Sequence, residues 1–123
     1  MAGFSLMEVL IALFIFSLVG LSIAKSTIVS MQAQLRAEMG NVARNLAVSK
    51  AEELSGVKIS DLDATYNDTE TDLAVSGHQT KFTRVTTVIV NSDNSRTIHI
   101  AVSGASAFLP YPISYSTRFA PWE

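Results

Sequence analysis

The feature that most constrains this chain is an apolar run that begins at Phe4 and continues to Ala24. Val, Leu, Ile, Phe and Ala make up most of the run, and Glu8 is its only charged residue. About 20 consecutive apolar residues are enough to cross a bilayer as an α-helix. We therefore expect a membrane-spanning helix over residues 4–25, close to the N-terminus.

Glu8 is a costly residue in such a helix. A charged group within a membrane segment costs about 2.5–3.5 kcal/mol on insertion scales, so it usually has a partner and a function. The nearest Lys or Arg is Lys25, which lies at the other end of the run, roughly 25 Å away at 1.5 Å per residue. We therefore expect Glu8 to pair with a free α-amino group from a neighbouring copy of the same helix.

The sequence from Gly3 to Leu13, GFSLMEVLIAL, resembles the type III signal of type IV pilins and type II secretion pseudopilins. The resemblance covers residues 1–25 and combines the Gly, an aromatic residue, the spacing of the Glu and the apolar run. In that family a membrane aspartyl protease, the prepilin peptidase, cuts after the Gly and methylates the new amine. The resemblance implies that residues 1–3 are a leader peptide, that Phe4 becomes the N-methylated first residue, and that Glu8 is the family's assembly glutamate.

The alternative of an ordinary secretory signal peptide fits less well. Such a peptide ends in small residues with an Ala-x-Ala cleavage site, whereas Ser26-Thr27-Ile28 follows Lys25 here. The leader does depart from the family, because it lacks the Lys or Arg that holds the N-terminus in the cytoplasm. Either the true start lies upstream of Met1, or the leader is minimal.

A second helical pattern follows over residues 26–56. Ser55-Gly56 predicts its end, with Gly at the C-cap, and we expect its apolar stripe to pack on the C-terminal domain, with a coiled-coil partner as the alternative. The stripe has the steps of three and four that are typical of one helix face and consists of Ile28, Met31, Leu35, Met39, Val42 and Leu46.

Residues 57–123 are predicted to form a small β domain. The sequence alternates with a period of two and is rich in β-branched residues, which favours strands. We expect an antiparallel sheet of three to four strands packed on the amphipathic helix, and hence an α+β fold. The predicted segments are a loop over 57–80, strands over 82–90 and 97–102 joined by a turn over 91–95, and a last strand over 113–119.

The loop contains a cluster of acidic and amide residues, namely Asp61, Asp63, Asn67, Asp68, Glu70 and Asp72. Oxygen-rich loops of this kind can bind calcium, but the Gly and the terminal Glu of an EF-hand are missing from their required positions. A solvated acidic loop is the simpler interpretation, and calcium binding stays open. His78 and His99 stand apart in the sequence and favour surface or strand positions over a metal site.

Catalysis, cofactor binding and nucleic-acid binding have no sequence support. No nucleophile elbow, Gly-rich phosphate loop or Cys/His metal framework is present in the sequence. The net charge is −2, with nine basic and eleven acidic residues, which does not favour a polyanion as partner. We therefore predict a protein that is not an enzyme, takes no cofactor and binds no nucleic acid, and we assign no residue to a metal site.

The resemblance implies a structural subunit of a type IV filament system. Its expected partners are other pilin or pseudopilin subunits, the prepilin peptidase, an inner-membrane assembly platform, and membrane lipid before assembly. The expected location is the bacterial inner membrane as a single-pass protein, and then a periplasmic or extracellular filament. The alternative is a single-pass membrane-anchored binding module. The sequence does not distinguish among a pilus, a secretion pseudopilus and a DNA-uptake filament.

Several features favour a minor subunit over a major one. Major pilins of the family usually have Gly where this chain has Ser17 and Pro where it has Lys25, so we expect the helix to be continuous between these two positions. Many major pilins of the family close their C-terminal loop with a disulfide, whereas this sequence has no Cys. The helix end over residues 43–54 and the order of helix and strands look similar to those of small I-type pseudopilins and V-type minor pilins. The alternative is the major subunit of a divergent pilus.

Overall fold

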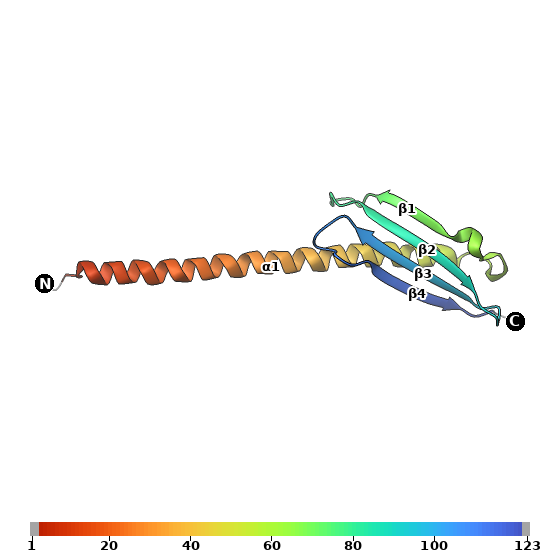
Figure 1. The fold of residues 1–123 in the computed structure, drawn as a ribbon, viewed down its shortest axis with the longest axis horizontal. Helices are drawn as coiled ribbons and strands as arrows, with labels where there is room; N and C mark the ends of the chain where they lie inside the picture. The colour runs from red at the N-terminus through yellow and green to blue at the C-terminus, as the bar shows by residue number, and fades with distance from the viewer. Residues whose placement is uncertain (1–2, 122–123) are drawn as a thin grey trace. The chain divides into compact units, whose positions relative to one another are not determined.

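The computed structural model describes residues 3–121. Two compact units make up the chain, Met1–Leu35 and Arg36–Glu123, and helix α1 contributes residues to both. The elements in chain order are α1 (Leu6–Ser55), the short 3-10 helices η1 (Ile59–Asp61) and η2 (Ala64–Tyr66), and strands β1 (Asp68–Leu73), β2 (Phe82–Val90), β3 (Arg96–Gly104) and β4 (Ile113–Phe119) (Figure 1).

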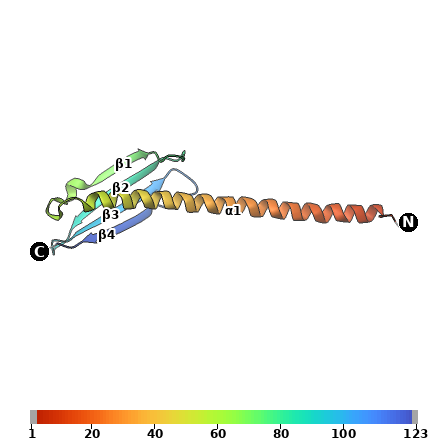
Figure 2. The same ribbon diagram turned by 180° about the vertical axis from the view of Figure 1, so that it is seen from behind.

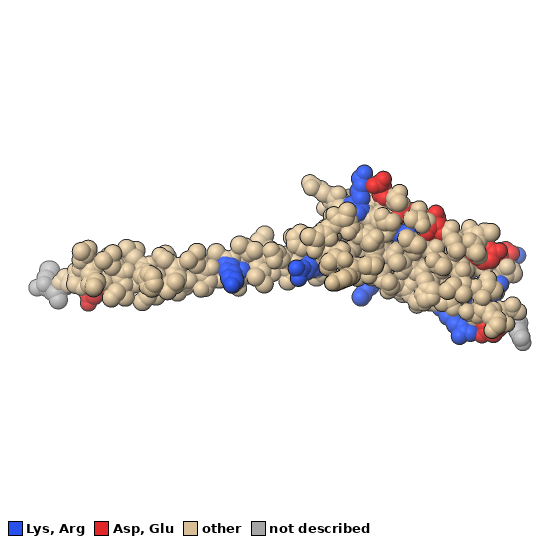
Figure 3. Space-filling model, viewed as in Figure 1, with Lys and Arg blue, Asp and Glu red and all other residues tan. Residues whose placement is uncertain are grey.

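The described part of the first unit is helical from Leu6 onward, and every residue from Gly3 to Leu35 is exposed. Within residues 3–121, α1 is the one helix that is long and apolar enough to span a membrane, and its apolar window has no buried residues. Figure 3 shows this segment as almost uniformly uncharged. A helix over most of residues 4–25 is thus confirmed, and it is compatible with a single membrane anchor.

Hydroxyl groups within the apolar segment are satisfied by the helix itself. Ser17 Oγ donates to the Leu13 carbonyl at 2.8 Å, and Ser22 Oγ donates to the Leu18 carbonyl at 2.9 Å. An unpaired hydroxyl is costly in an apolar medium, so these bonds suit a helix that lies in lipid or against other helices. The helix is continuous between Ser17 and Lys25, as the sequence predicted.

The second unit is a four-stranded antiparallel sheet in the order β1-β2-β3-β4, with the C-terminal part of α1 packed on one face (Figures 1 and 2). The predicted strands over 82–90 and 113–119 are confirmed, and the strand predicted over 97–102 extends to Arg96–Gly104. The α+β architecture and the four-strand count agree with the sequence-based prediction.

The core lies between α1 and the inner face of the sheet. Alternate residues of β2 and β3 are buried there, as a period of two requires. On β4 the corresponding positions, among them Ile113, Tyr115 and Phe119, are half-buried. The side chains buried to 2 % exposure or less are those of Ala43, Ala47, Leu54, Leu62, Phe82, Thr86, Ser95, Ile98, Ile100 and Val102.

The helix face that packs on the sheet contains only the second half of the predicted stripe: Met39 is buried, and Val42 and Leu46 are half-buried against the core. Ile28, Met31 and Leu35 are exposed, and they do not belong to the unit that contains the sheet. The buried face is instead centred on small residues, with Ala43 and Ala47 fully buried. The small side chain of alanine lets the helix backbone lie close to the sheet.

The prediction of a loop over residues 57–80 was wrong in part, because β1 lies within it. The strand sequence DTETDL has no apolar alternation and a low strand propensity. It forms because its backbone pairs with β2, with Asp68 opposite Thr86 and Glu70 opposite Arg84. This pairing is a tertiary effect that the local pattern does not contain.

The helix end was also predicted incorrectly in its details. α1 ends at Ser55 as expected, but among the described glycines only Gly77 has a positive φ, so Gly56 is not a left-handed C-cap. Instead, the Gly56 N–H donates to the Glu53 carbonyl at 3.3 Å and the Val57 N–H to the Leu54 carbonyl at 3.1 Å. These tighter 3-10 bonds satisfy the last carbonyl groups of the helix.

Candidate functional site

The N-terminus of α1 is closed by two reciprocal hydrogen bonds between Ser5 and Glu8. The Ser5 N–H donates to Glu8 Oε2 at 2.9 Å, and the Glu8 N–H donates to Ser5 Oγ at 3.2 Å. This is a capping box, in which a Ser at the N-cap and a Glu three residues later each satisfy a backbone donor of the other. The helix starts at Leu6 because Ser5 is the residue that caps it.

The capping box gives Glu8 a role within its own chain. The first N–H groups of a helix have no intrahelical partner, and each unsatisfied group costs several kcal/mol in lipid. A negative charge near a helix N-terminus adds about 0.3–1 kcal/mol of favourable interaction with the helix dipole. Glu8 Oε2 is used in this way, whereas Oε1 accepts no hydrogen bond among the described residues.

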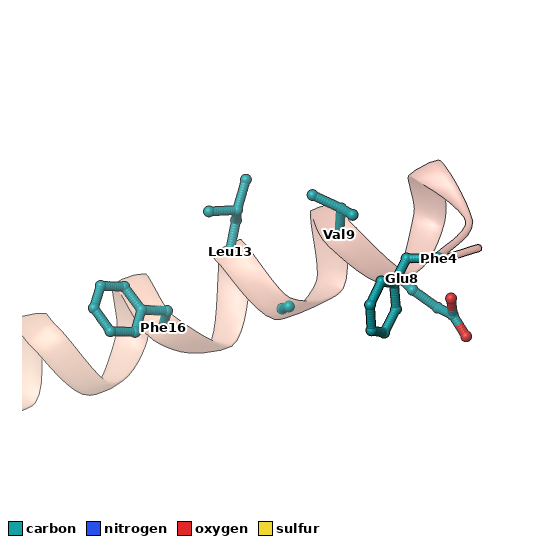
Figure 4. Close-up of a pocket in the computed structure, with 6 residues that line it drawn as sticks. Phe4, Glu8, Val9, Leu13 and Phe16 are labelled. Carbon is teal, nitrogen blue, oxygen red and sulfur yellow. The ribbon is translucent and has the colours of Figure 1, made fainter. Parts of the chain in front are cut away.

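Side chains on one face of the helix beside Glu8 border a shallow depression that is open to the outside. The depression measures about 590 Å³ and is lined by Phe4, Glu8, Val9, Ala12, Leu13 and Phe16. Figure 4 shows the rings of Phe4 and Phe16 at the two ends of this stretch and the Glu8 carboxylate beside Phe4. The spacing of these residues places them on one helix face. Such a face can receive another apolar helix while keeping a carboxylate at its edge.

The predicted processing site lies just before the helix. Gly3 has no neighbouring atom where a side chain would begin, and Phe4 is 90 % exposed. Both precede the first helical residue, so the peptide bond between them is accessible. The remaining leader residues, Met1 and Ala2, lie outside the described residues.

Ser5 is the functional residue that the sequence interpretation missed. The pattern Ser-x-x-Glu ahead of an apolar run is the sequence signature of a capping box. Ser5 and Glu8 have this spacing, so the signal was present in the sequence.

The acidic cluster is not assembled into a metal site. Among residues 3–121, no three His, Asp or Glu side chains converge. Asp63 instead caps η2 by accepting bonds from the Thr65 N–H at 2.8 Å and the Thr65 hydroxyl at 2.6 Å, and these bonds hold the pKa of Asp63 below its usual value. His78 Nε2 lies 3.5 Å from Glu38 Oε1, and His99 is exposed on β3.

A partly buried charge network joins α1 to the sheet. Arg84 Nε donates to Glu70 Oε2 at 2.6 Å, and Arg84 Nη1 donates to the Leu46 carbonyl at 2.9 Å. Lys50 Nζ lies 3.9 Å from the same Glu70 oxygen and 3.3 Å from Glu53 Oε1. The Arg84 hydrogen bond is the main cause of the lowered pKa of Glu70. This network positions β1 against β2 and α1.

Comparisons with protein-family models, with curated proteins and with solved structures found no match for this chain. The functional interpretation therefore depends on the residues of the chain itself.

Proposed function

We propose that this chain is a structural subunit of a type IV filament system, a minor pilin or pseudopilin that assembles through its N-terminal helix. The observation that carries the proposal is the accessible junction between Gly3 and Phe4, followed at once by a capped apolar helix whose only charge before Lys25 is Glu8. Before assembly the protein is a single-pass protein of the bacterial inner membrane. After cleavage by a prepilin peptidase it enters a periplasmic or extracellular filament with other subunits, through an inner-membrane assembly platform.

The two oxygens of Glu8 support a division of roles. Oε2 caps its own helix. Oε1 is available to accept a hydrogen bond from the methylated, positively charged amine of Phe4 in a neighbouring subunit. Opposite charges about 4 Å apart attract far more strongly in a low-dielectric helix core than in water. A subunit out of register leaves both charges unpaired, so this contact sets the axial register during assembly. The apolar face between Phe4 and Phe16 receives the neighbouring helix.

The alternative function, a membrane-anchored binding module, gains support from the capping box. A simple anchor also benefits from a capped helix, so the presence of Glu8 does not by itself distinguish the two functions. The charge of Glu8 therefore has to be tested separately from its capping role.

Glu8→Gln separates these roles, because Gln at this position retains the capping box and removes the charge. We expect both Glu8→Gln and Glu8→Val to insert into membranes normally but to be lost from sheared filament fractions. Ser5→Ala is the matched control, since it removes the hydroxyl cap and keeps the charge; it should retain most of its incorporation. If Glu8→Gln enters filaments like the wild type, pairing with a neighbour's amine is refuted and the anchor function is favoured.

The proposed processing has its own test. We expect the mature chain from filaments to begin at Phe4 and to carry one extra methyl group on its amine. Intact-mass measurement and N-terminal sequencing determine both features. A mature chain that begins at another residue would contradict the assignment to the pilin family.

A further inference from the structure

The sheet has two free edges that differ in how they are protected. β1 carries Asp68 and Asp72, its register with β2 shifts between Glu70 and Leu73, and Asp72 has a φ of 58°. Charges and bulges of this kind are how proteins prevent an edge from pairing with other chains. β4 pairs with β3 at seven consecutive positions without a shift, and Arg118 is its only charge. The β4 edge is thus regular and poorly protected.

The phase of the hydrogen bonds shows which backbone groups face that edge. The Asn91 N–H donates to the Ser95 carbonyl at 2.9 Å, so the odd-numbered residues of β3 direct their backbone groups toward β2. The Val88 N–H donates to Asn67 Oδ1 at 2.7 Å, so the even-numbered residues of β2 direct their backbone groups toward β1, which agrees with this assignment. The even-numbered residues of β3 therefore bond to β4. The N–H and C=O groups of Ser114, Ser116 and Arg118 consequently point to the free edge.

A groove follows the same edge on the inner side of the sheet. It measures about 190 Å³ and lies between β4, with Tyr115 and Phe119, and α1, with Val48 and Ala51. Glu52 of α1 lines it as well and forms no ion pair within the described part of the chain. The groove can therefore take apolar side chains and one basic side chain from whatever pairs with β4.

We propose that the free edge of β4 binds an extended segment of a different protein as a fifth, antiparallel strand. The segment bonds to the backbone groups of Ser114, Ser116 and Arg118, and every second side chain enters the groove. Its chemistry is an apolar residue at alternate positions and a Lys or Arg opposite Glu52. Strand addition of this kind draws affinity from main-chain hydrogen bonds and specificity from alternate side chains. This interaction surface goes beyond the filament role and does not depend on it.

A second copy of this chain fits the edge less well. The residues of β4 on the side of the groove are Ile113, Tyr115, Thr117 and Phe119, so a second β4 offers no basic side chain opposite Glu52. Pairing of β4 with β1 of another copy is limited by the β1 bulge, because only Thr69 and Thr71 offer outward backbone groups there. The occupant is therefore a strand from another protein.

The experiment uses the full chain in membranes of the organism that makes it. The sequence contains no Cys, so Ser114→Cys and Ser116→Cys each provide a unique thiol on β4. A benzophenone maleimide attached to the thiol is photoactivated, and the crosslinked residues are mapped by mass spectrometry. We expect both positions to reach one other protein at sites about two residues apart, in the reverse chain order that an antiparallel strand requires.

Proline substitution tests the backbone contact directly. The N–H of Ser116 faces the free edge, so Ser116→Pro removes a donor for the partner without breaking the ladder to β3. We expect it to reduce crosslinking from the probe at position 114 at least tenfold. Thr69→Pro is the matched control on the outward side of β1 and should leave crosslinking unchanged. Ser114→Pro with the probe at position 116 repeats the test if Ser116→Pro fails to fold, as judged by circular dichroism.

Four results would overturn the proposal. These are the absence of a crosslink, crosslinks scattered over unrelated residues, full crosslinking in both proline variants, and crosslinks to β4 of a second copy. Coexpression of two copies with different tags identifies the last result. Each failure leaves the Glu8 experiments unaffected, because they concern a different part of the chain.

Discussion

Thr86 places a hydroxyl in the core without a partner. Its side chain lies on the inner face of β2 and is 1 % exposed, and it is the only described residue with a fully buried side-chain polar atom that makes no hydrogen bond. A buried polar group without a partner costs about 1–3 kcal/mol. The Thr86 hydroxyl on the inner face of the sheet therefore destabilises the folded domain.

Replacing this hydroxyl should stabilise the domain. We expect Thr86→Val to raise the free energy of unfolding by about 1 kcal/mol, because a methyl group replaces an unsatisfied hydroxyl of similar size. Urea denaturation of the detergent-solubilised chain, followed by circular dichroism, measures the change. Thr87→Val, on the opposite face of the same strand, is the control and should stay within about 0.5 kcal/mol. A loss of stability in Thr86→Val would show that the hydroxyl has a partner in solution.

At the residue scale, the sequence predicted the residues of the candidate site more fully than it predicted which charged side chains are buried. Gly3, Phe4 and Glu8 are adjacent in one motif, and Ser5 was recoverable from its spacing to Glu8. Lys50 gave no such signal. It lies on the helix among alanines, and its burial depends on Glu70, which is brought near it only when β1 pairs with β2.

At the scale of elements, a charge network adds to the apolar core in connecting β1 and β2 to α1. Glu70 accepts a bond from Arg84, which in turn donates to the helix carbonyl of Leu46. The hydrogen bond from Arg84, followed by the nearby charges of Arg84 and Lys50, lowers the pKa of Glu70 in the folded state. A lowered folded-state pKa means that the unfolded chain binds the proton more readily, so this stabilisation is present above the unfolded pKa and is lost as the pH falls.

We therefore predict an acid-sensitive domain. Stability should fall as the pH drops below the usual value for Glu of about 4.5, through the lower pKa of folded Glu70. Glu70→Gln should lower the free energy of unfolding by about 1.5–3 kcal/mol at neutral pH, since Arg84 loses a charged partner, and should flatten the acid dependence. Urea denaturation at pH 7, 5, 4 and 3 compares the two chains. Some dependence should remain, because hydrogen bonds also lower the pKa values of Asp63 and Asp93. An unchanged pH profile in Glu70→Gln would contradict the role of Glu70.

The predictability of the elements follows from where their stabilising contacts lie. Strands β3 and β4 place apolar residues mainly on their buried face, so local pattern predicted them. β2 was predicted from its richness in β-branched residues, because its buried face includes Arg84 and Thr86 while Val85 and Ile89 are exposed. β1 has no such face, and it forms through backbone pairing at the edge and through the contact of Glu70 with Arg84. The buried helix face was predicted only in part for a related reason: it includes Met39 of the predicted stripe, but its fully buried positions are Ala43 and Ala47, which a search for large apolar residues does not detect.

At the scale of the whole molecule, the place of the chain in a filament depends on its helix. The helix has neither Gly at position 17 nor Pro at position 25, and it is continuous through both. Ser17 reinforces it with a bond to the Leu13 carbonyl. Lys25 is exposed and places a cation directly after the apolar run. Burial of Lys25 in a filament core without a paired anion is costly. A major subunit would incur this cost at every position along the filament, whereas a subunit at the filament end would incur it once.

We therefore expect a rare subunit that initiates or caps the filament. Quantitative mass spectrometry of purified filaments should find this chain at well below the amount of another pilin. Deleting its gene should reduce the number of filaments more than it changes their diameter. Lys25→Ala tests the physical reason, because removal of the cation should allow this chain to enter the filament shaft in larger amounts if the charge is what restricts it. A chain that already makes up most of the filament mass would refute the minor role and leave only the broader pilin proposal, since a continuous helix with Lys25 would then be compatible with every position along the filament.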